Sequence, residues 1–162
     1  MLISVIIPTF NEEENIGKLV SFLKKSTTDG LIEIIVSDGG SSDNTMTVAE
    51  SAGAMVLASP LKGRSGQMHF ATTKARGDIF YFVHADCIPP QTFYTDIITA
   101  FKNGYTVGRY KTSFQSDNIF LKINQWFTRF DWLVCMGGDQ SLFAERELYH
   151  QAGGFDTSLV IM

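Results

Sequence analysis

The feature of this sequence that most constrains its fold is a regular alternation of short apolar segments with amphipathic ones over the first hundred residues. Apolar runs rich in β-branched and aromatic side chains, typical of buried strands, lie at 2–7, 33–37, 55–58 and 78–83. Segments with helical periodicity separate these runs, and no hairpin signal joins one run to the next. This order predicts an α/β fold in three layers, with a mostly parallel sheet and right-handed crossovers.

The segments between the strands carry helix start and stop signals. Asn11 is expected to cap the first helix, with Glu14 as its reciprocal capping partner, and Gly53 is expected to end a second helix over 45–52. The buried face of the first helix is indicated by the spacing of Ile16, Leu19, Val20 and Leu23. Further helices are expected over 65–75 and after the two prolines at 89 and 90.

The pattern is less regular beyond residue 104. We expect a strand within 107–114, a helix over 117–130, a short strand over 142–144 and a short helix over 146–152. The segment 117–130 has a wide aromatic and aliphatic face, which packs most economically in the core or against a second copy of the chain. The alternative is that this segment makes a shallow contact with the inner face of a membrane, because amphipathic helices with aromatic side chains bind at the membrane–water interface.

Length, charge and cysteine usage exclude several classes of protein. A chain of 162 residues predicts one domain, at about 150 residues per domain. The 13 basic and 17 acidic residues give a net charge of −4, which argues against broad nucleic-acid binding because phosphates need a basic surface. No apolar stretch reaches the ~18 residues of a membrane span. Cys87 and Cys135 lie far apart without metal-ligand spacing, as expected for reduced thiols of a cytoplasmic protein.

Polar and charged residues follow the predicted parallel strands at their carboxyl ends, where ligands bind in such sheets. They are residues 8–12, Asp38, residues 60–64, His84 and Asp86. Two carboxylates and a cationic side chain at one edge suit an anionic ligand held partly through a divalent metal. The sequence has neither the glycine-rich dinucleotide fingerprint nor the P-loop pattern. The first turn also lacks the glycine- and arginine-rich loop expected of a sugar-nucleotidyltransferase, which argues against that activity.

Several ordered motifs resemble those of the GT-A glycosyltransferases of family 2. They are Ser4–Glu12, Ile35–Thr45, Phe82–Asp86, Gly138-Asp139-Gln140 and Gly153-Gly154-Phe155. Each motif alone is weak, but the ordered set covers nearly the whole chain. Within the family, the bacterial selenodomain-associated transferases are most similar, on the turn at 38–41, the stretch 63–68 and the segments ending at Asp86 and Gln140. The resemblance implies a GT-A fold that binds a nucleotide-diphosphate sugar.

The resemblance also implies roles for single residues. Asp38 matches the carboxylate that contacts the donor base, usually uracil, and Arg64 lies in the loop that approaches the diphosphate. Asp86 matches the direct ligand of Mn²⁺ or Mg²⁺, a hard cation that prefers oxygen ligands. His84 stands where the family usually has aspartate. Two functional roles are open, a metal ligand or a contact with the sugar or ribose, and the third is a structural role as a histidine packed at the strand end. The donor-binding residues expected on this basis are Pro8, Thr9, Glu12, Asp38, Arg64, His84 and Ala85.

The acceptor side is expected to be incomplete. Residues 1–104 would form the donor-binding half of a single GT-A-like domain, and residues 105–162 part of an acceptor half that includes Asp139 and Gln140. Inverting transfer needs a general base, and in the family an acidic residue follows the segment that 153–155 resembles. The sequence ends at Met162, where that residue would be expected next, which favours a truncated enzyme. Asp139 and Asp156 are the fallback candidates for the base within the sequence.

These inferences predict a metal-dependent inverting glycosyltransferase that uses a nucleotide-diphosphate sugar, most readily a UDP-sugar. The acceptor hydroxyl belongs to a glycan, a lipid or a small molecule, and the sequence does not distinguish them. The alternative is a catalytically inactive module that binds a nucleotide sugar or acts as a scaffold. The sequence leaves the oligomeric state open.

Overall fold

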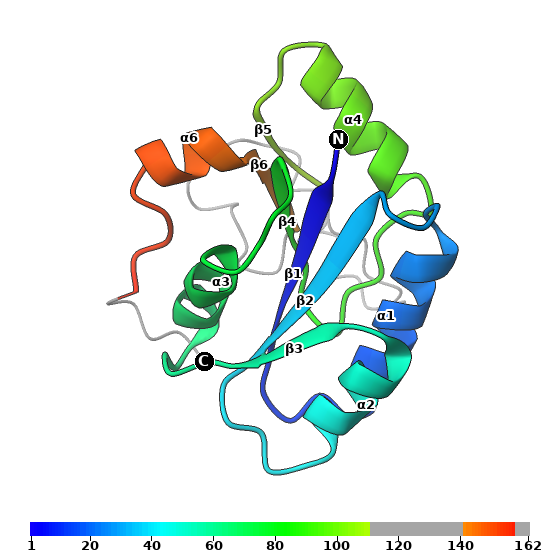
Figure 1. Cartoon of the computed structure of the whole chain (residues 1–162), viewed down its shortest axis with the longest axis vertical. Helices are drawn as coiled ribbons and strands as arrows, with labels where there is room; N and C mark the ends of the chain where they lie inside the picture. The colour runs from blue at the N-terminus through cyan, green and yellow to red at the C-terminus, as the bar shows by residue number, and fades with distance from the viewer. Residues whose placement is uncertain (111–140, 158–162) are drawn as a thin grey trace, which may run out of the picture.

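The computed structural model describes residues 1–110 and 141–157, in which six strands form one sheet in the order β3-β2-β1-β4-β6-β5 (Figure 1). The strands are β1 (Ile3–Thr9), β2 (Ile32–Asp38), β3 (Met55–Ala58), β4 (Ile79–Phe82), β5 (Val107–Arg109) and β6 (Leu142–Glu145). The helices are α1 (Ile16–Lys25), α2 (Thr45–Ala52), α3 (Arg64–Thr72), α4 (Phe93–Lys102) and α6 (Arg146–Gln151).

The sheet is parallel through its first four strands. β1 pairs with β2 and β4, and β2 pairs with β3, all in the parallel sense. β6 lies between β4 and β5 and is antiparallel to both. The predicted α/β fold with a mostly parallel sheet is therefore confirmed, with an antiparallel extension from the second half of the chain.

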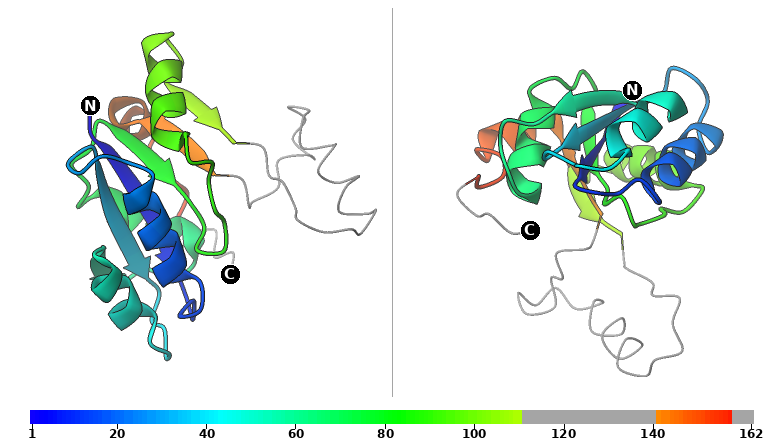
Figure 2. Two further views of the ribbon diagram at one scale, coloured as in Figure 1. Left: turned by 90° about the vertical axis from the view of Figure 1, so that its right-hand side faces the viewer. Right: turned by 90° about the horizontal axis from the view of Figure 1, so that it is seen from below.

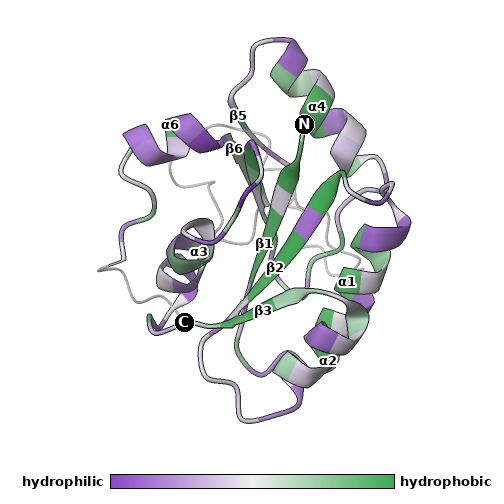
Figure 3. Ribbon diagram, in the orientation of Figure 1, coloured by the Kyte–Doolittle hydropathy of each residue, from purple (hydrophilic) through white to green (hydrophobic). Residues whose placement is uncertain are grey.

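Helices cover both faces of the sheet and give the three layers expected (Figure 2). Side chains of β1 alternate between the faces, since successive residues of a strand point to opposite sides. Ile3, Val5 and Ile7 pack with α1, α2 and α4, while Ile6 packs with α3 and α6. All four are fully buried, and burying such a side chain contributes about 1.5–3 kcal/mol. Figure 3 shows the hydrophobic strands between helices whose outer faces are hydrophilic.

β1 continues through Pro8 to Thr9, two residues beyond the apolar run 2–7 that predicted the strand. Pro8 pairs with Ser37 and Thr9 with Asp38 in the register of β2. The main-chain oxygen of Ile6 accepts from Val83, so the alternate residues Ile6 and Pro8 face β4. β4 ends at Phe82, and the missing N–H of Pro8 therefore leaves no ladder hydrogen bond unmade.

The first helix begins later than predicted, and Asn11 does not cap it. α1 begins at Ile16, its N-cap position is Asn15, and no side chain makes a capping bond there. Asn11 has a left-handed φ of 56°, and its side-chain oxygen accepts from the N–H of Ser42 instead. The predicted buried face of α1 is confirmed, as is the end of α2 at Gly53, which has a φ of 93°.

Some predictions lie outside the described residues. These are the helix over 117–130 with its core, dimer or membrane surface, the thiol of Cys135, the acceptor-side Asp139 and Gln140, and the chain end at Met162. None of the helices in the described ranges is long and apolar enough to cross a membrane.

Candidate functional site

A cavity of about 510 Å³ opens at the carboxyl ends of β1, β2 and β4. Its lining residues are Pro8, Thr9, Phe10, Glu12, Gly39, Gly40, Lys62, Gly63, Arg64, Gln67, His84, Ala85 and Asp86. Loops that follow four different strands therefore converge on one space, as the topology of a parallel sheet requires. The cavity brings together all of the predicted donor-binding and metal-binding residues except Asp38.

Asp38 lies beneath the cavity wall, at the end of β2, and is only 1% exposed. Its Oδ1 accepts hydrogen bonds from Thr9 Oγ1 at 3.1 Å and from Ser41 Oγ at 2.5 Å. Its Oδ2 accepts from the N–H groups of Gly40 and Ser41, at 2.9 and 2.8 Å. A carboxylate offers about four lone-pair sites, so Asp38 is fully occupied in holding the turn above it.

The turns after β1 and β2 are tied to each other by side chains. Asn11 N–H donates to Ser41 Oγ at 2.8 Å, and Ser42 N–H donates to Asn11 Oδ1 at 2.9 Å. Farther along, Glu13 Oε2 accepts from both the N–H and the side-chain amide of Asn44. The two turns thus form one cross-linked wall of the cavity.

Gln67 joins this wall to α3. Its Nε2 donates to the main-chain oxygen of Thr9 at 2.6 Å, and the N–H of Gly39 donates to the same oxygen at 2.9 Å. A Cβ added at Gly39 would lie 2.4 Å from Gln67 Nε2, so a side chain at this position would displace the amide. Gln67 was not among the predicted site residues. Its position is unusual for a polar side chain, because Gln67 lies among the buried residues Gly66, Met68 and Ala71 of α3. A polar residue on the buried side of a predicted helix is the sequence signal that could have identified it.

The amino end of α3 gives the cavity a positive end. Gly63 is its N-cap residue with a φ of 82°, and Arg64 is its first residue. The first turn has no acidic residue and no side-chain cap, so its N–H groups and the helix dipole can meet an anion. Lys62 and Arg64, both exposed at this end, add two positive charges. The prediction placed Arg64 in a loop, whereas in the structure it is the first residue of α3.

Carboxylates lie on the other part of the lining. Asp86 is exposed, and the thiol of Cys87 lies 3.5 Å from its Oδ1 as a weak donor. Glu12 Oε2 accepts from the side-chain amide of Asn15 at 2.9 Å. His84 is half-buried and lines the same cavity. The site therefore presents cationic groups and carboxylates to one bound molecule.

The side chains of the site can bind a divalent cation only together with a ligand. Within residues 1–110 and 141–157, no group of three His, Cys, Asp or Glu side chains could hold a metal ion on its own. Mg²⁺ and similar ions are usually bound through one or two carboxylates, with substrate phosphates and water completing the shell. The exposed carboxylate of Asp86 fits such a shared site, in which the ligand supplies the other oxygens.

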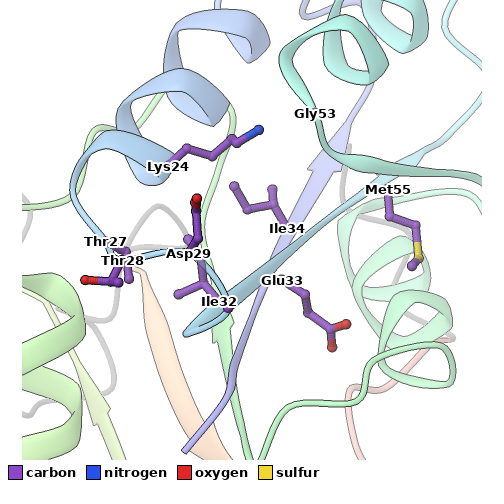
Figure 4. Close-up of a pocket in the computed structure, with 10 residues that line it drawn as sticks. Lys24, Thr27, Thr28, Asp29, Ile32, Glu33, Ile34, Gly53 and Met55 are labelled. Atoms are coloured by element: carbon purple, nitrogen blue, oxygen red, sulfur yellow. The ribbon is translucent and has the colours of Figure 1, made fainter.

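A second hollow, of about 230 Å³, lies at the amino end of β2 and contains none of the predicted site residues (Figure 4). Lys24, Asp29 and Glu33 are among the residues that line it. Lys24 Nζ lies 2.5 Å from the position a Cβ would take at Gly53, the C-cap of α2. Its charge therefore complements the negative end of that helix, which is a structural role.

Comparisons with known proteins identify the family of this chain. The family model described as Glycosyl transferase family 2 matches residues 4–154. A curated relative, glucosyl-3-phosphoglycerate synthase of Mycolicibacterium smegmatis, is 33% identical over 100 residues, which are 57% of this chain and 33% of the relative. This chain thus matches about a third of that relative's length.

Two crystal structures of glucosyl-3-phosphoglycerate synthase from Mycobacterium tuberculosis share the fold. The complex with Mg²⁺ and uridine diphosphate has a TM-score of 0.67, and the complex with Mn²⁺, uridine-diphosphate-glucose and phosphoglyceric acid has 0.65. Each is 24% identical, and each match covers 90% of this chain and 57% of that one. These structures show the same fold, and the match of the family model over residues 4–154 shows that the chain belongs to glycosyl transferase family 2.

Proposed function

We propose that the 510 Å³ cavity binds a UDP-sugar and that the chain serves a metal-dependent inverting glycosyltransferase. The observation that carries the proposal is the convergence of a positive helix end, an exposed carboxylate and a cross-linked polar wall on one cavity. The two Mycobacterium tuberculosis synthase crystals named above hold UDP with Mg²⁺ and UDP-glucose with Mn²⁺. The stretch 63–68 and the end of β4 favour the selenodomain-associated transferases within the family.

The nucleoside is proposed to lie against the turns after β1 and β2. Thr9, Gly39 and Gly40 line this part, and Phe10, which is 56% exposed, provides an aromatic face at its rim. Asp38 was expected to contact the base directly. Because its oxygens are already engaged, we assign it the indirect role of holding the turn that faces the base.

The diphosphate is proposed to lie at the amino end of α3. Arg64 and Lys62 would neutralise its charge, and the first-turn N–H groups of α3 would donate to its oxygens. Asp86 would hold Mn²⁺ or Mg²⁺ jointly with these oxygens, with His84 beside it as a further ligand or a sugar contact. The metal supplies positive charge that stabilises the departing diphosphate.

Transfer follows from this placement. The acceptor oxygen bonds to the anomeric carbon as the bond from that carbon to the diphosphate breaks, and UDP leaves with the electron pair. The acceptor proton passes to a carboxylate base. Asp139 remains the predicted candidate for that base and Gln140 a predicted acceptor contact. The acceptor class, a cytoplasmic location and the lack of nucleic-acid binding also remain predictions.

The test is a thermal-shift panel of nucleoside diphosphates with and without Mn²⁺. At a hundredfold excess over its Kd, a ligand stabilises the folded state by about 2.7 kcal/mol. For a chain of this size this corresponds to a rise in Tm of roughly 5–10 °C. UDP with Mn²⁺ should give the largest rise, and no shift with any nucleoside diphosphate would contradict the proposal. Binding of UDP-sugars without release or transfer of the sugar would favour the inactive binding module.

A further inference from the structure

The segment 153–157, which follows α6, is fastened to the fold through Tyr149. This tyrosine lies within α6, is buried, and packs in the hydrophobic cluster on the α3 side of the sheet. Its hydroxyl accepts a hydrogen bond from the main-chain N–H of Phe155 at 3.2 Å. The ring of Phe155 meets the rings of Phe82 and Tyr149 edge to face, with centroids 4.8 and 5.6 Å away. Because Phe82 is the last residue of β4, these contacts hold Phe155 at the carboxyl end of that strand.

The same hydroxyl connects the segment to α3, which lies beside it (Figure 1). Nδ1 of His69, in the middle of α3, lies 3.3 Å from the oxygen of Tyr149. Burial raises the pKa of Tyr149 from its usual 10, so the hydroxyl keeps its hydrogen. It can therefore donate to Nδ1 of a neutral His69 while it accepts from Phe155. A Cβ at Gly154 would lie only 2.8 Å from the same Nδ1, so the main chain of the segment passes directly against His69.

Both elements that hold this segment also build the ligand cavity. α3 contributes Arg64, and the loop after β4 contributes His84 and Asp86. Asp156, a fallback candidate for the base, comes directly after the anchored Phe155. The contacts of Phe155 therefore fix the main chain that carries Asp156 relative to the elements of the donor site.

We propose that Tyr149 and His69 are positioning residues for the acceptor side, which couple the segment 153–157 to the helix assigned to the donor diphosphate. The inference rests on the proposed function and adds a link from the donor site to the acceptor segment. A helix transmits restraint along its length, so a ligand at the amino end of α3 also restrains His69 and, through Tyr149, the main chain at Phe155. Neither side chain lines the cavity, so this role is separate from contact with the ligand.

The experiment measures hydrogen exchange of single main-chain amides by NMR, without ligand and with UDP and Mn²⁺. Tyr149→Phe removes only the hydroxyl, so the Phe155 amide should exchange about fivefold faster, as expected for one lost hydrogen bond. The amide of Gly153, which bonds to the main-chain oxygen of His150, should keep its rate. In the wild type, UDP with Mn²⁺ should slow exchange at Phe155 by roughly fivefold or more, the lower end of couplings between sites. This slowing should be absent in Tyr149→Phe, although its Kd for UDP stays close to that of the wild type.

Three further variants separate positioning from a purely structural role. His69→Leu should lose the slowing by UDP, whereas His69→Asn, which offers an acceptor in place of Nδ1, should retain it. A purely structural role of Tyr149 would lower Tm and leave the slowing by UDP intact. Tyr94→Phe is the matched control, because the Tyr94 hydroxyl donates to the main-chain oxygen of Met1 on the other side of the sheet. Its exchange at Phe155 should equal that of the wild type in both conditions.

The outcomes for the inference and for the proposed function differ. Equal exchange of the Phe155 amide in the wild type and in Tyr149→Phe would overturn the inference without any ligand. Binding of UDP to the wild type with no slowing at Phe155 would overturn it as well, while the binding itself would still support the proposed function. Failure of the wild type to bind UDP would overturn the proposed function and the inference together.

Discussion

Gln67 donates from its side-chain amide to the main-chain oxygen of Thr9 across 2.6 Å, and this bond joins α3 to the end of β1. The same oxygen accepts from Gly39, so the end of β1, the turn after β2 and helix α3 meet at one atom. Because a carbonyl oxygen has two lone pairs, these two donors satisfy it fully. The geometry of the cavity wall therefore depends on the space between Gly39 and Gln67.

Gly39→Ala is predicted to displace the Gln67 amide. The new methyl group would lie 2.4 Å from Nε2, and the side chain would have to give up its bond to Thr9. We expect a loss of stability of about 1–3 kcal/mol, typical of overpacking, and weaker UDP binding. Urea unfolding and calorimetry of Gly39→Ala, Gln67→Ala and the double variant measure the coupling. The cost of Gly39→Ala should shrink when Gln67 is truncated, and an unchanged cost would contradict the contact.

Asp38→Asn is predicted to reduce stability and UDP affinity together. The amide nitrogen of asparagine cannot accept the hydrogen bonds that the carboxylate accepts from the turn, and bonds to a charged group contribute about 1.5–3 kcal/mol. Tm and the Kd for UDP are the two readouts, with the exposed Asp29→Asn as control. A change in base preference at unchanged Tm would instead show that Asp38 reads the base directly.

Asp86→Asn is predicted to remove the part of UDP affinity that depends on Mn²⁺. The exposed carboxylate makes few contacts within the fold, so Tm without ligand should stay close to that of the wild type. Calorimetric titration with UDP, with Mn²⁺ and with EDTA, separates the metal-dependent part from the rest. If Mn²⁺ strengthens UDP binding equally in both proteins, the ion is held elsewhere.

Glu33 is predicted to stabilise the fold above its carboxyl pKa and not below it. Burial acts to raise the pKa of Glu33, but hydrogen bonds from Ser4, Arg76 and Gly77 outweigh it and lower the pKa below 4.5. The unfolded state therefore binds the proton more readily, and the contribution is lost as pH falls through the lowered pKa. Stability should differ between wild type and Glu33→Gln by ~2 kcal/mol at pH 7, and by less at pH 3.

Urea unfolding from pH 7 to pH 3 measures this difference, with Glu50→Gln on the exposed face of α2 as control. The control variant should follow the wild-type profile throughout. A difference between wild type and Glu33→Gln that is constant over the whole range would contradict the role of the ionised carboxylate.

The sequence predicted most of the sheet because its signals there are local. Continuous apolar runs identify strands buried on both faces, and Gly53 ends α2 in the left-handed conformation that glycine tolerates. The loops at the carboxyl ends of these strands follow from the topology, so the lining of the cavity was largely predictable. The antiparallel position of β6 between β4 and β5 was not predictable, because no tight-turn signal in the sequence indicates a hairpin there.

The errors concern residues whose partners are distant in the sequence. Asn11 has the pattern of a helix cap, yet its side chain bonds to Ser42, which is 31 residues away. Gln67 meets Thr9 across 58 residues, and nothing local marks the pairing. Asp38 was correctly placed at the strand end. However, the hydrogen bonds that occupy its carboxylate oxygens depend on a turn whose conformation the sequence does not specify. Side-chain hydrogen bonds of this kind compete with local preferences, and long-range packing decides between them.

Anomalous diffraction at the manganese edge, from crystals of this chain soaked with UDP and Mn²⁺, tests the proposed site most directly. The predicted result is UDP in the 510 Å³ cavity, with its base against Gly39 and Gly40 and a manganese peak bridging Asp86 and the diphosphate. UDP bound in the hollow at the amino end of β2, or manganese remote from Asp86, would contradict the proposal.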